Sequence, residues 1–208
     1  MVDDRARCPR CLIKERLCVC ALVPRVVVRT PLVIARHVAE RKRPGATARF
    51  AADAIAGTVV VEHGAEGVPT VMPPLGAGAW LLFPGGGPLP APADVKTLVV
   101  VDGTWHQARR MMQRVPGVAG LPLLSLPPPP ADAVRPRRSK RVDGMSTLEA
   151  IAAAYAWLEG DAIAAPLRWL HAQVVERLRV GSRGLKPGDR DAGRPTEADL
   201  LATVSPYL

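Results

Sequence analysis

One stretch of the chain, residues 97–114, constrains the fold more than any other. It reads TLVVVDGTWHQARRMMQR, and it opens with β-branched and apolar residues, as in a strand that is buried on both faces. Asp102 and Gly103 end this run, and Thr104 belongs to the residue types that cap helix N-termini. Apolar residues then recur at helical spacing as far as Val115. The stretch predicts a strand, a tight turn and a helix, with a carboxylate where the strand ends.

The position of Asp102 allows two interpretations. In open α/β sheets, ligands bind at the carboxyl ends of the strands, because loops and helix N-termini meet there. On this interpretation Asp102 is a candidate for ligand chemistry. In the simpler alternative, the stretch is an ordinary β–α connection and Asp102 only helps to cap the helix. The pattern alone favours neither.

Short apolar runs alternate with helical segments along the rest of the chain. Further strands are expected at residues 32–35, 58–62, 79–83 and 121–126. Helices are expected at residues 47–56, 146–158 and 166–180. This alternation predicts an α/β fold with a mainly parallel sheet flanked by helices. We expect the chain to comprise an N-terminal cysteine segment (1–24), a main domain (25–180) and a C-terminal tail (181–208).

The charge and the hydropathy pattern restrict the partners. Lys and Arg number 28 against 19 Asp and Glu, which gives a formal net charge of +9. Such an excess favours a polyanionic partner, with nucleic acid as the first candidate. No stretch approaches the roughly 20 apolar residues of a membrane span. The start, MVDDRARCPRC, also lacks the apolar core of a secretory signal, so we expect a cytoplasmic protein without a membrane partner.

All cysteines lie near the start of the chain, in the pattern CPRCLIKERLCVC. Clustered thiolates in a reducing compartment suit zinc, which binds four sulfurs tetrahedrally. Cys8 and Cys11 have the usual two-residue spacer, whereas Cys18 and Cys20 are separated by a single residue, a tighter spacing than in a zinc ribbon. The pattern favours a structural zinc site with these four ligands. Unligated thiols on a surface arm are the alternative.

The strand expected at 79–83 runs into the sequence PGGGP. Consecutive glycines let the backbone approach a ligand closely, or they form only a hinge. Neither the spaced glycines of a dinucleotide site nor a Gly-Lys-Ser phosphate loop is present, which disfavours a dehydrogenase.

Two basic segments are candidates for contacts with an RNA backbone. The first contains Arg36, His37, Arg41, Lys42, Arg43 and Arg49. The second, RPRRSKR, contains Arg135, Arg137, Arg138, Lys140 and Arg141. Both segments have the alternative of ordinary solvated charge, and His37 that of a structural histidine. Shortly after the second segment, Ser146 and Glu149 have the spacing of a capping box that begins a helix.

Taken together, these motifs resemble the DTW-domain family. The family name describes Asp-x-Thr-Trp, which matches Asp102, Thr104 and Trp105, and Gln-Ala-Arg follows. Further matches are the cysteine cluster, His37-x-x-Glu40, Leu82-Phe83-Pro84 and the Ser-Thr-x-Glu-Ala of residues 146–150. One departure is Ala46, which stands where the family usually has Asn. The matching motifs span residues 8–150.

The resemblance implies a SPOUT-like, trefoil-knotted sheet and a tRNA-uridine aminocarboxypropyltransferase. Such an enzyme moves the 3-amino-3-carboxypropyl group of S-adenosylmethionine to N3 of a uridine in tRNA and releases methylthioadenosine. Asp102 is then the candidate catalytic residue, either as the base that takes the imide proton or as the anchor of the cofactor's α-amino group. The implied cofactor-binding residues are Phe83, Pro84, Gly85, Thr104, Trp105, Ser146 and Thr147. No obligatory protein partner is evident.

Two other functions stay open at this point. One is a SPOUT-type RNA methyltransferase that uses the same cofactor but yields a different small product. The other is a non-catalytic module that binds zinc and RNA. For Phe83, Thr104, Trp105 and Thr147, core packing or helix capping is the alternative to a cofactor contact.

Overall fold

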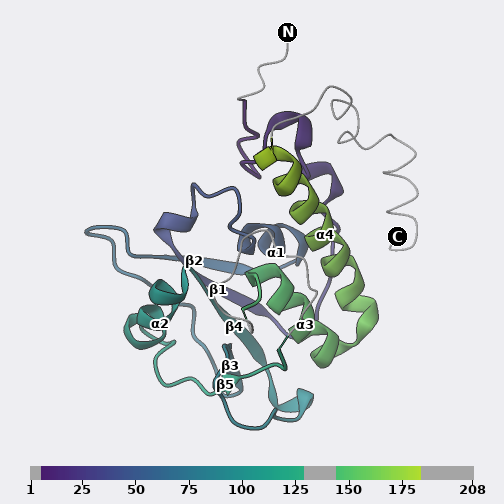
Figure 1. The fold of residues 1–208 in the computed structure, drawn as a ribbon. Coiled ribbons are helices and arrows are strands. Elements are labelled where there is room, and N and C mark those ends of the chain that lie inside the picture. Colours follow the sequence, from purple (N-terminus) through teal and green to yellow (C-terminus); the bar gives the residue numbers. More distant parts are fainter. Residues whose placement is uncertain (1–5, 129–143, 184–208) are drawn as a thin grey trace.

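The computed structural model describes residues 6–128 and 144–183 (Figure 1). Within them, five strands form one sheet in the order β2-β1-β4-β3-β5, and every pairing is parallel. The strands are β1 (Leu32–His37), β2 (Val59–His63), β3 (Ala79–Leu82), β4 (Thr97–Asp102) and β5 (Leu123–Leu124). The predicted α/β class and parallel sheet are confirmed.

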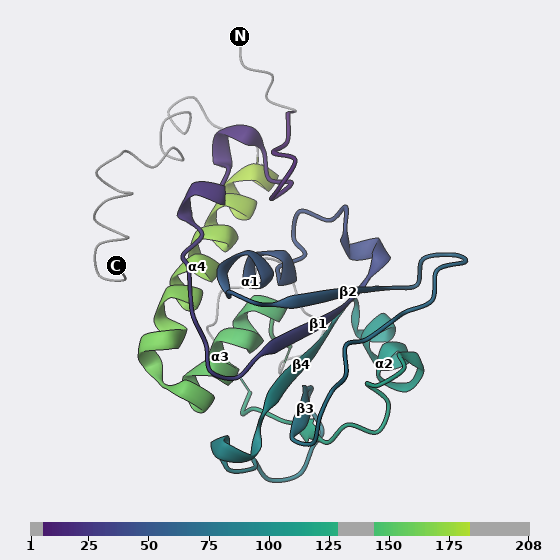
Figure 2. The ribbon, with the colours of Figure 1, turned by 180° about the vertical axis from the view of Figure 1, so that it is seen from behind.

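Helices cover both faces of the sheet. The α-helices are α1 (Ala48–Ala54), α2 (Trp105–Arg114), α3 (Thr147–Glu159) and α4 (Asp161–Arg183). Short 3-10 turns are η1 (Glu15–Leu17), η2 (Cys20–Leu22), η3 (Val38–Glu40) and η4 (Pro92–Asp94). Figures 1 and 2 show α1, α3 and α4 on one side of the sheet and α2 on the other. None of the helices in the described ranges combines the length and apolar character needed to cross a bilayer.

The side-chain alternation of the central strands divides the core into two parts. Ile34 of β1 and Val100 of β4 are buried in the cluster that contains α1, α3 and α4. Their neighbours Ala35 and Val101 point to the other face and pack with Met111 of α2. β1 and β4 are therefore buried on both faces, as the apolar run of residues 97–101 predicts.

Two predicted boundaries are wrong. α4 begins at Asp161, ahead of the expected start at Pro166, which lies inside the helix. Gly160, with φ of 97°, ends α3 and turns the chain directly into α4, whose apolar residues then pack against α3. Pro166 is the sixth residue of α4, so the helix lacks the hydrogen bond that an N–H at this position would donate to the carbonyl oxygen of Ala162. β5 is also shorter than expected, and at its start Pro122 has no N–H to donate to a neighbouring strand.

The N-terminal cysteine segment packs onto the main body of the protein. Ile13 and Leu17 are buried in the same cluster as α1, α3 and α4. The segment lies beside the last turns of α4 in both views, and a Cβ at Gly181 would lie 3.5 Å from Leu17 Cδ1. Arg49 of α1 also donates to the carbonyl oxygen of Arg10 at 3.1 Å. The alternative of a loose surface arm is therefore wrong.

Candidate functional site

A pocket of about 140 Å³ lies at the carboxyl edge of the sheet. Its lining residues are Leu82, Phe83, Pro84, Val100, Val101, Gly103, Trp105, Ala108, Leu124, Leu126, Met145, Thr147 and Ala150. They come from the ends of β3, β4 and β5 and from the first turns of α2 and α3. Three motifs that are far apart in the sequence thus form one pocket, in the position where parallel α/β sheets bind ligands.

The wall of this pocket is mostly apolar and partly aromatic. The rings of Phe83 and Trp105 pack edge to face, with their centroids 5.5 Å apart. Thr147 adds a hydroxyl group. Of the predicted cofactor-binding residues, Phe83, Pro84, Trp105 and Thr147 line the pocket, whereas Gly85, Thr104 and Ser146 are adjacent in sequence to residues that do.

The glycines after β3 are used by the fold itself. Gly85 has φ of 102°, and its N–H donates to Ser125 Oγ at 3.1 Å. A Cβ at Gly86 would lie 2.6 Å from the carbonyl oxygen of Leu123. These glycines therefore allow the backbone after β3 to lie close to β5 and to Ser125, which follows it.

Asp102 lies behind the pocket wall. The residue is only 3% exposed and is not among those that line the pocket. Thr147 Oγ1, which does line the pocket, donates to Asp102 Oδ1 at 2.7 Å. Because the strands are in register, Asp102 is beside Arg36 of β1, and Arg36 is beside its ion-pair partner Glu62 of β2. Glu62, Arg36 and Asp102 form a charged row across three strands.

The first turn of α3 begins with the predicted capping box. Ser146 Oγ accepts from the N–H of Glu149 at 3.3 Å, and the Glu149 carboxylate accepts from the N–H of Ser146 at 3.0 Å. These bonds satisfy two donors that a helix N-terminus otherwise leaves unpaired.

This turn is also bonded to three other elements. Ser146 Oγ bonds His171 Nε2 of α4 at 2.9 Å, Thr147 Oγ1 donates to Asp102 of β4, and the N–H of Leu148 donates to Thr47 Oγ1, before α1, at 3.1 Å. Burial lowers the pKa of His171, with the negative charge of Glu149 acting in the opposite direction. Three consecutive residues thus hold Thr147 in its place beside the pocket.

The first turn of α2 has a second capping box, formed by Thr104 and Gln107. Gln107 Oε1 accepts from the N–H of Thr104 at 2.8 Å, and Gln107 Nε2 lies 3.2 Å from His37 Nδ1. The N–H of Ala39 also donates to His37 Nδ1, at 3.1 Å. Two donors at Nδ1 place the proton of the neutral ring on Nε2. A Cβ at Gly103 would lie 3.0 Å from Gln107 Cβ, so a side chain there would displace Gln107.

The first basic segment is partly occupied by contacts within the protein. Arg36 pairs with Glu62, Arg43 pairs with Glu40, and Arg49 donates to the carbonyl oxygens of residues 10, 40, 41 and 43. Burial lowers the pKa of Arg49. Arg41 and Lys42 are exposed to solvent. The second segment, Arg135 to Arg141, lies outside the described residues.

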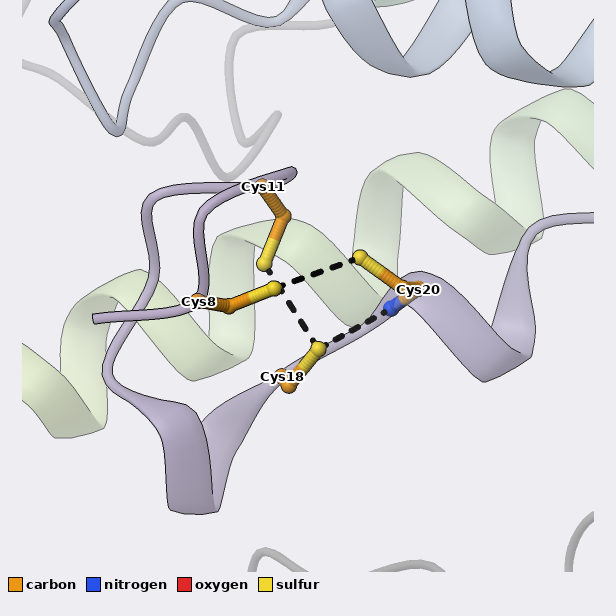
Figure 3. Close-up of side chains that lie close together, drawn as sticks. All are labelled: Cys8, Cys11, Cys18 and Cys20. Carbon is orange, nitrogen blue, oxygen red and sulfur yellow. Dashed lines mark hydrogen bonds between the residues drawn. The ribbon is translucent and has the colours of Figure 1, made fainter. Parts of the chain in front are cut away.

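The four cysteine sulfurs point toward one another and lie within 4.8 Å (Figure 3). The Sγ atoms of Cys8 and Cys20 are 3.7 Å apart, and those of Cys11 and Cys18 are 3.8 Å apart. Four sulfurs bound tetrahedrally to zinc at about 2.3 Å are about 3.8 Å from one another. The N–H of Cys20 also points at Cys18 Sγ, at 3.5 Å, as expected beside a thiolate. The cluster can hold a metal ion and is compatible with zinc.

The thiols differ in how easily they lose a proton. Burial raises the pKa of Cys18 and of Cys20. Burial acts in the same direction on Cys8, but hydrogen bonds from the backbone of Cys11 and Arg10 and from the side chains of Cys18 and Cys20 together outweigh it and lower the pKa of Cys8 to about 7. A bound cation would favour the thiolate form at all four positions.

Two residues beside the pocket, Gln107 and His171, were not predicted from the sequence. Gln107 stands three residues after Thr104, which is the spacing of a capping box, so this signal was available. His171 had no comparable signal, because it is 25 residues away from Ser146 and reaches it only through the packing of α4 on α3.

The fold and the site define an α/β protein with a ligand pocket at the carboxyl edge of a parallel sheet and a metal-type cysteine cluster. The family model of the DTW domain matches residues 5–179, a range that contains every pocket residue and all four cysteines. The chain belongs to the DTW-domain family, the family of tRNA-uridine aminocarboxypropyltransferases. This membership indicates a tRNA-modifying transferase and implies a tRNA substrate. No solved structure matches the chain.

Proposed function

We propose that this protein transfers the 3-amino-3-carboxypropyl group of S-adenosylmethionine to N3 of a uridine in tRNA and releases methylthioadenosine. The observation that carries the proposal is the convergence of Leu82-Phe83-Pro84, Asp102 to Trp105 and Ser146 to Ala150 on one pocket. Family membership supports the same reaction. It also supports a SPOUT-like knot, which stays a prediction because residues 129–143, between β5 and α3, lie outside the described part of the chain.

The pocket residues suit S-adenosylmethionine in their chemistry. The rings of Phe83 and Trp105 and the apolar wall fit the adenine ring and the methyl and methylene groups of S-adenosylmethionine, and the Thr147 hydroxyl offers a polar contact. When bound, S-adenosylmethionine supplies a sulfonium whose γ-carbon is already activated for displacement. The main task of the protein is then to hold two reactants in line, and such positioning contributes much of the rate gain in two-substrate reactions.

Asp102 and Thr147 act as a unit in this proposal. The uridine nitrogen must lose its imide proton, and a carboxylate within hydrogen-bond reach accepts such a proton effectively. The same carboxylate could instead hold the positive α-amino group of the cofactor. In both roles, Thr147 connects the buried Asp102 to the pocket, because it lines the pocket and its hydroxyl group donates to Asp102 Oδ1.

Zinc bound by Cys8, Cys11, Cys18 and Cys20 stabilises the N-terminal segment, and basic residues hold the tRNA backbone without reading its sequence. A tRNA-modifying reaction fits the cytoplasm.

The reaction is tested with tRNA and S-adenosylmethionine labelled either in the carboxyl group or in the methyl group. Aminocarboxypropyl transfer puts the carboxyl label into tRNA and the methyl label into methylthioadenosine. Methyl label in tRNA, with S-adenosylhomocysteine as the product, would show a methyltransferase and contradict the proposal. Tight tRNA binding without transfer of either label would favour the non-catalytic zinc and RNA-binding module.

A further inference from the structure

We propose that the exposed face of α2 binds the phosphate backbone of the RNA substrate beside the pocket. This face carries the α2 stripe, which consists of Arg109, Arg110 and Arg114. The inference rests on the proposed tRNA substrate. It adds a contact surface outside the two basic segments that the sequence pattern singles out.

α2 has one buried and one exposed side. Ala108 and Met111 of α2 are buried against the sheet. His106, Arg109, Arg110, Gln113 and Arg114 are exposed. With about 100° between successive residues, these exposed positions fall within an arc of about 140°. The three arginines therefore share one solvent-facing side of the helix.

No described acidic residue pairs with the positive charge of the α2 stripe. α2 contains no acidic residue, and no ion pair between described residues involves an arginine of the α2 stripe. Arg110 and Arg114 are four residues apart, a spacing at which like charges repel and destabilise a helix. Phosphate groups would remove this repulsion, and the guanidinium group matches phosphate geometry well.

The α2 stripe begins one helical turn from the pocket. Trp105 lines the pocket and stands one helical turn before Arg109 on the same helix. The exposed Arg41 and Lys42 follow β1, and β1 pairs with β4, which leads into α2. Figures 1 and 2 both show η3 and α2 at the same end of the sheet. An RNA backbone on α2 would thus bring a nucleotide close to the pocket mouth.

Other exposed arginines provide a matched control. Arg25 and Arg29 precede β1, at the opposite edge of the sheet, and Arg168 lies on α4 and pairs with Asp161. Arg29 lies next to Glu159, at the end of α3. Replacing these three residues removes as much positive charge as replacing the α2 stripe, but far from the pocket.

The test compares R109Q/R110Q/R114Q with R25Q/R29Q/R168Q in binding to total tRNA over a range of salt concentrations. The association constant K for tRNA falls as salt rises, and each lost phosphate contact makes the negative slope of log K against log salt shallower by about 0.7 to 0.9. We expect the stripe variant to lose about two units of slope and to bind at least about tenfold more weakly at 0.1 M salt. The control variant should change binding by less than about twofold. Without RNA at low salt, the stripe variant should unfold at the same or a higher temperature than the wild type, because repulsion has been removed.

An unchanged salt slope in the stripe variant would overturn the inference, and so would an equal loss in the control variant. If the triple variant does not fold, R110Q and R110K replace it, and only R110K should keep the wild-type slope. Wild-type protein that binds tRNA and transfers the group, together with an unaffected stripe variant, would contradict this inference alone. Wild-type protein that does not bind tRNA would contradict the proposed function as well.

Discussion

At the scale of single residues, the candidate site contains a buried carboxylate, Asp102, and a hydroxyl group that donates to it, that of Thr147. Asp102 ends β4 next to Arg36 of the neighbouring strand, and Thr147 approaches it from α3. Burying a charged group without partners costs much free energy, so a carboxylate in this position needs hydrogen-bond donors and nearby cations. Asp102 has a donor in Thr147 and a cation in the strand beside it.

Replacing Asp102 by Asn tests the carboxylate. Asn has nearly the same shape and can still accept from Thr147, so the variant should fold and bind tRNA normally. Without the charge, turnover should fall about 10²-fold or more. Single-turnover formation of methylthioadenosine measures this, with the exposed Asp94→Asn as a control that keeps full activity. Full activity of Asp102→Asn would remove Asp102 from the chemistry but leave the reaction class standing.

Replacing Thr147 by Val or Ser tests the hydroxyl. Val has a similar volume but no donor, so the Asp102 carboxylate loses its bond, and kcat should fall about tenfold with little change in the affinity for tRNA. Ser keeps the hydroxyl and should retain most of the activity. Equal kcat values for the two variants would show that the hydrogen bond has no part in turnover.

At the scale of elements, the first turn of α3 joins the halves of the site. Residues 146–148 bond to α4, β4 and the start of α1, and the turn brings Thr147 and Ala150 to the pocket opposite Trp105 of α2. Each of these hydrogen bonds is modest by itself. Together they allow little movement of the turn against the sheet.

The buried His171, which bonds Ser146, predicts that the free energy of unfolding depends on pH. Burial lowers the pKa of His171 below its ordinary value of 6.5, despite the nearby Glu149. Below about pH 6.5 the unfolded chain therefore takes up a proton that the folded protein resists. The contribution of neutral His171 to the free energy of unfolding is complete above pH 6.5 and is lost as the pH falls toward the folded pKa.

Urea unfolding at pH 7.5 and pH 5.5 measures this effect. The wild type should lose more stability between the two pH values than His171→Gln, whose side chain does not titrate. His106→Gln, on the exposed side of α2, should behave like the wild type. The same pH dependence in His171→Gln and the wild type would show that another group is responsible.

At the scale of the whole molecule, the cysteine cluster connects the N-terminal segment to the rest of the fold. Leu17 packs near the end of α4, and Arg49 links the carbonyl oxygen of Arg10 to the loop that follows β1. A metal ion bound by the four thiolates would hold this segment closed, and such metal binding contributes directly to folding free energy.

Metal analysis of freshly prepared, reduced protein should find about one zinc ion per chain. Cys11→Ser should release the metal and lower the unfolding temperature by about 5 °C or more. Ala21→Ser, an exposed change beside Cys20, should keep both the metal and the stability. Wild-type protein without zinc would exclude the proposed structural metal.

Features that depend on neighbouring residues could be predicted from the sequence. The strand and helix of residues 97–114, the N-cap at Thr104, the box of Ser146 and Glu149 and the close thiols of the cysteine segment all follow from side chains a few positions apart. Short-range spacing specifies these features because one strand, one helical turn or one metal ion needs only local geometry.

The sequence pattern did not predict which of these segments contact one another in the folded protein. The strand order places Arg36 beside Asp102, and the packing of α4 on α3 brings His171 to Ser146 and carries the helix through Pro166. The pocket likewise exists only because β3, α2 and α3 converge at one edge of the sheet. Such contacts join residues far apart in the chain. Their free energy comes from burying apolar surface between elements, and that burial depends on the whole arrangement rather than on any local pattern.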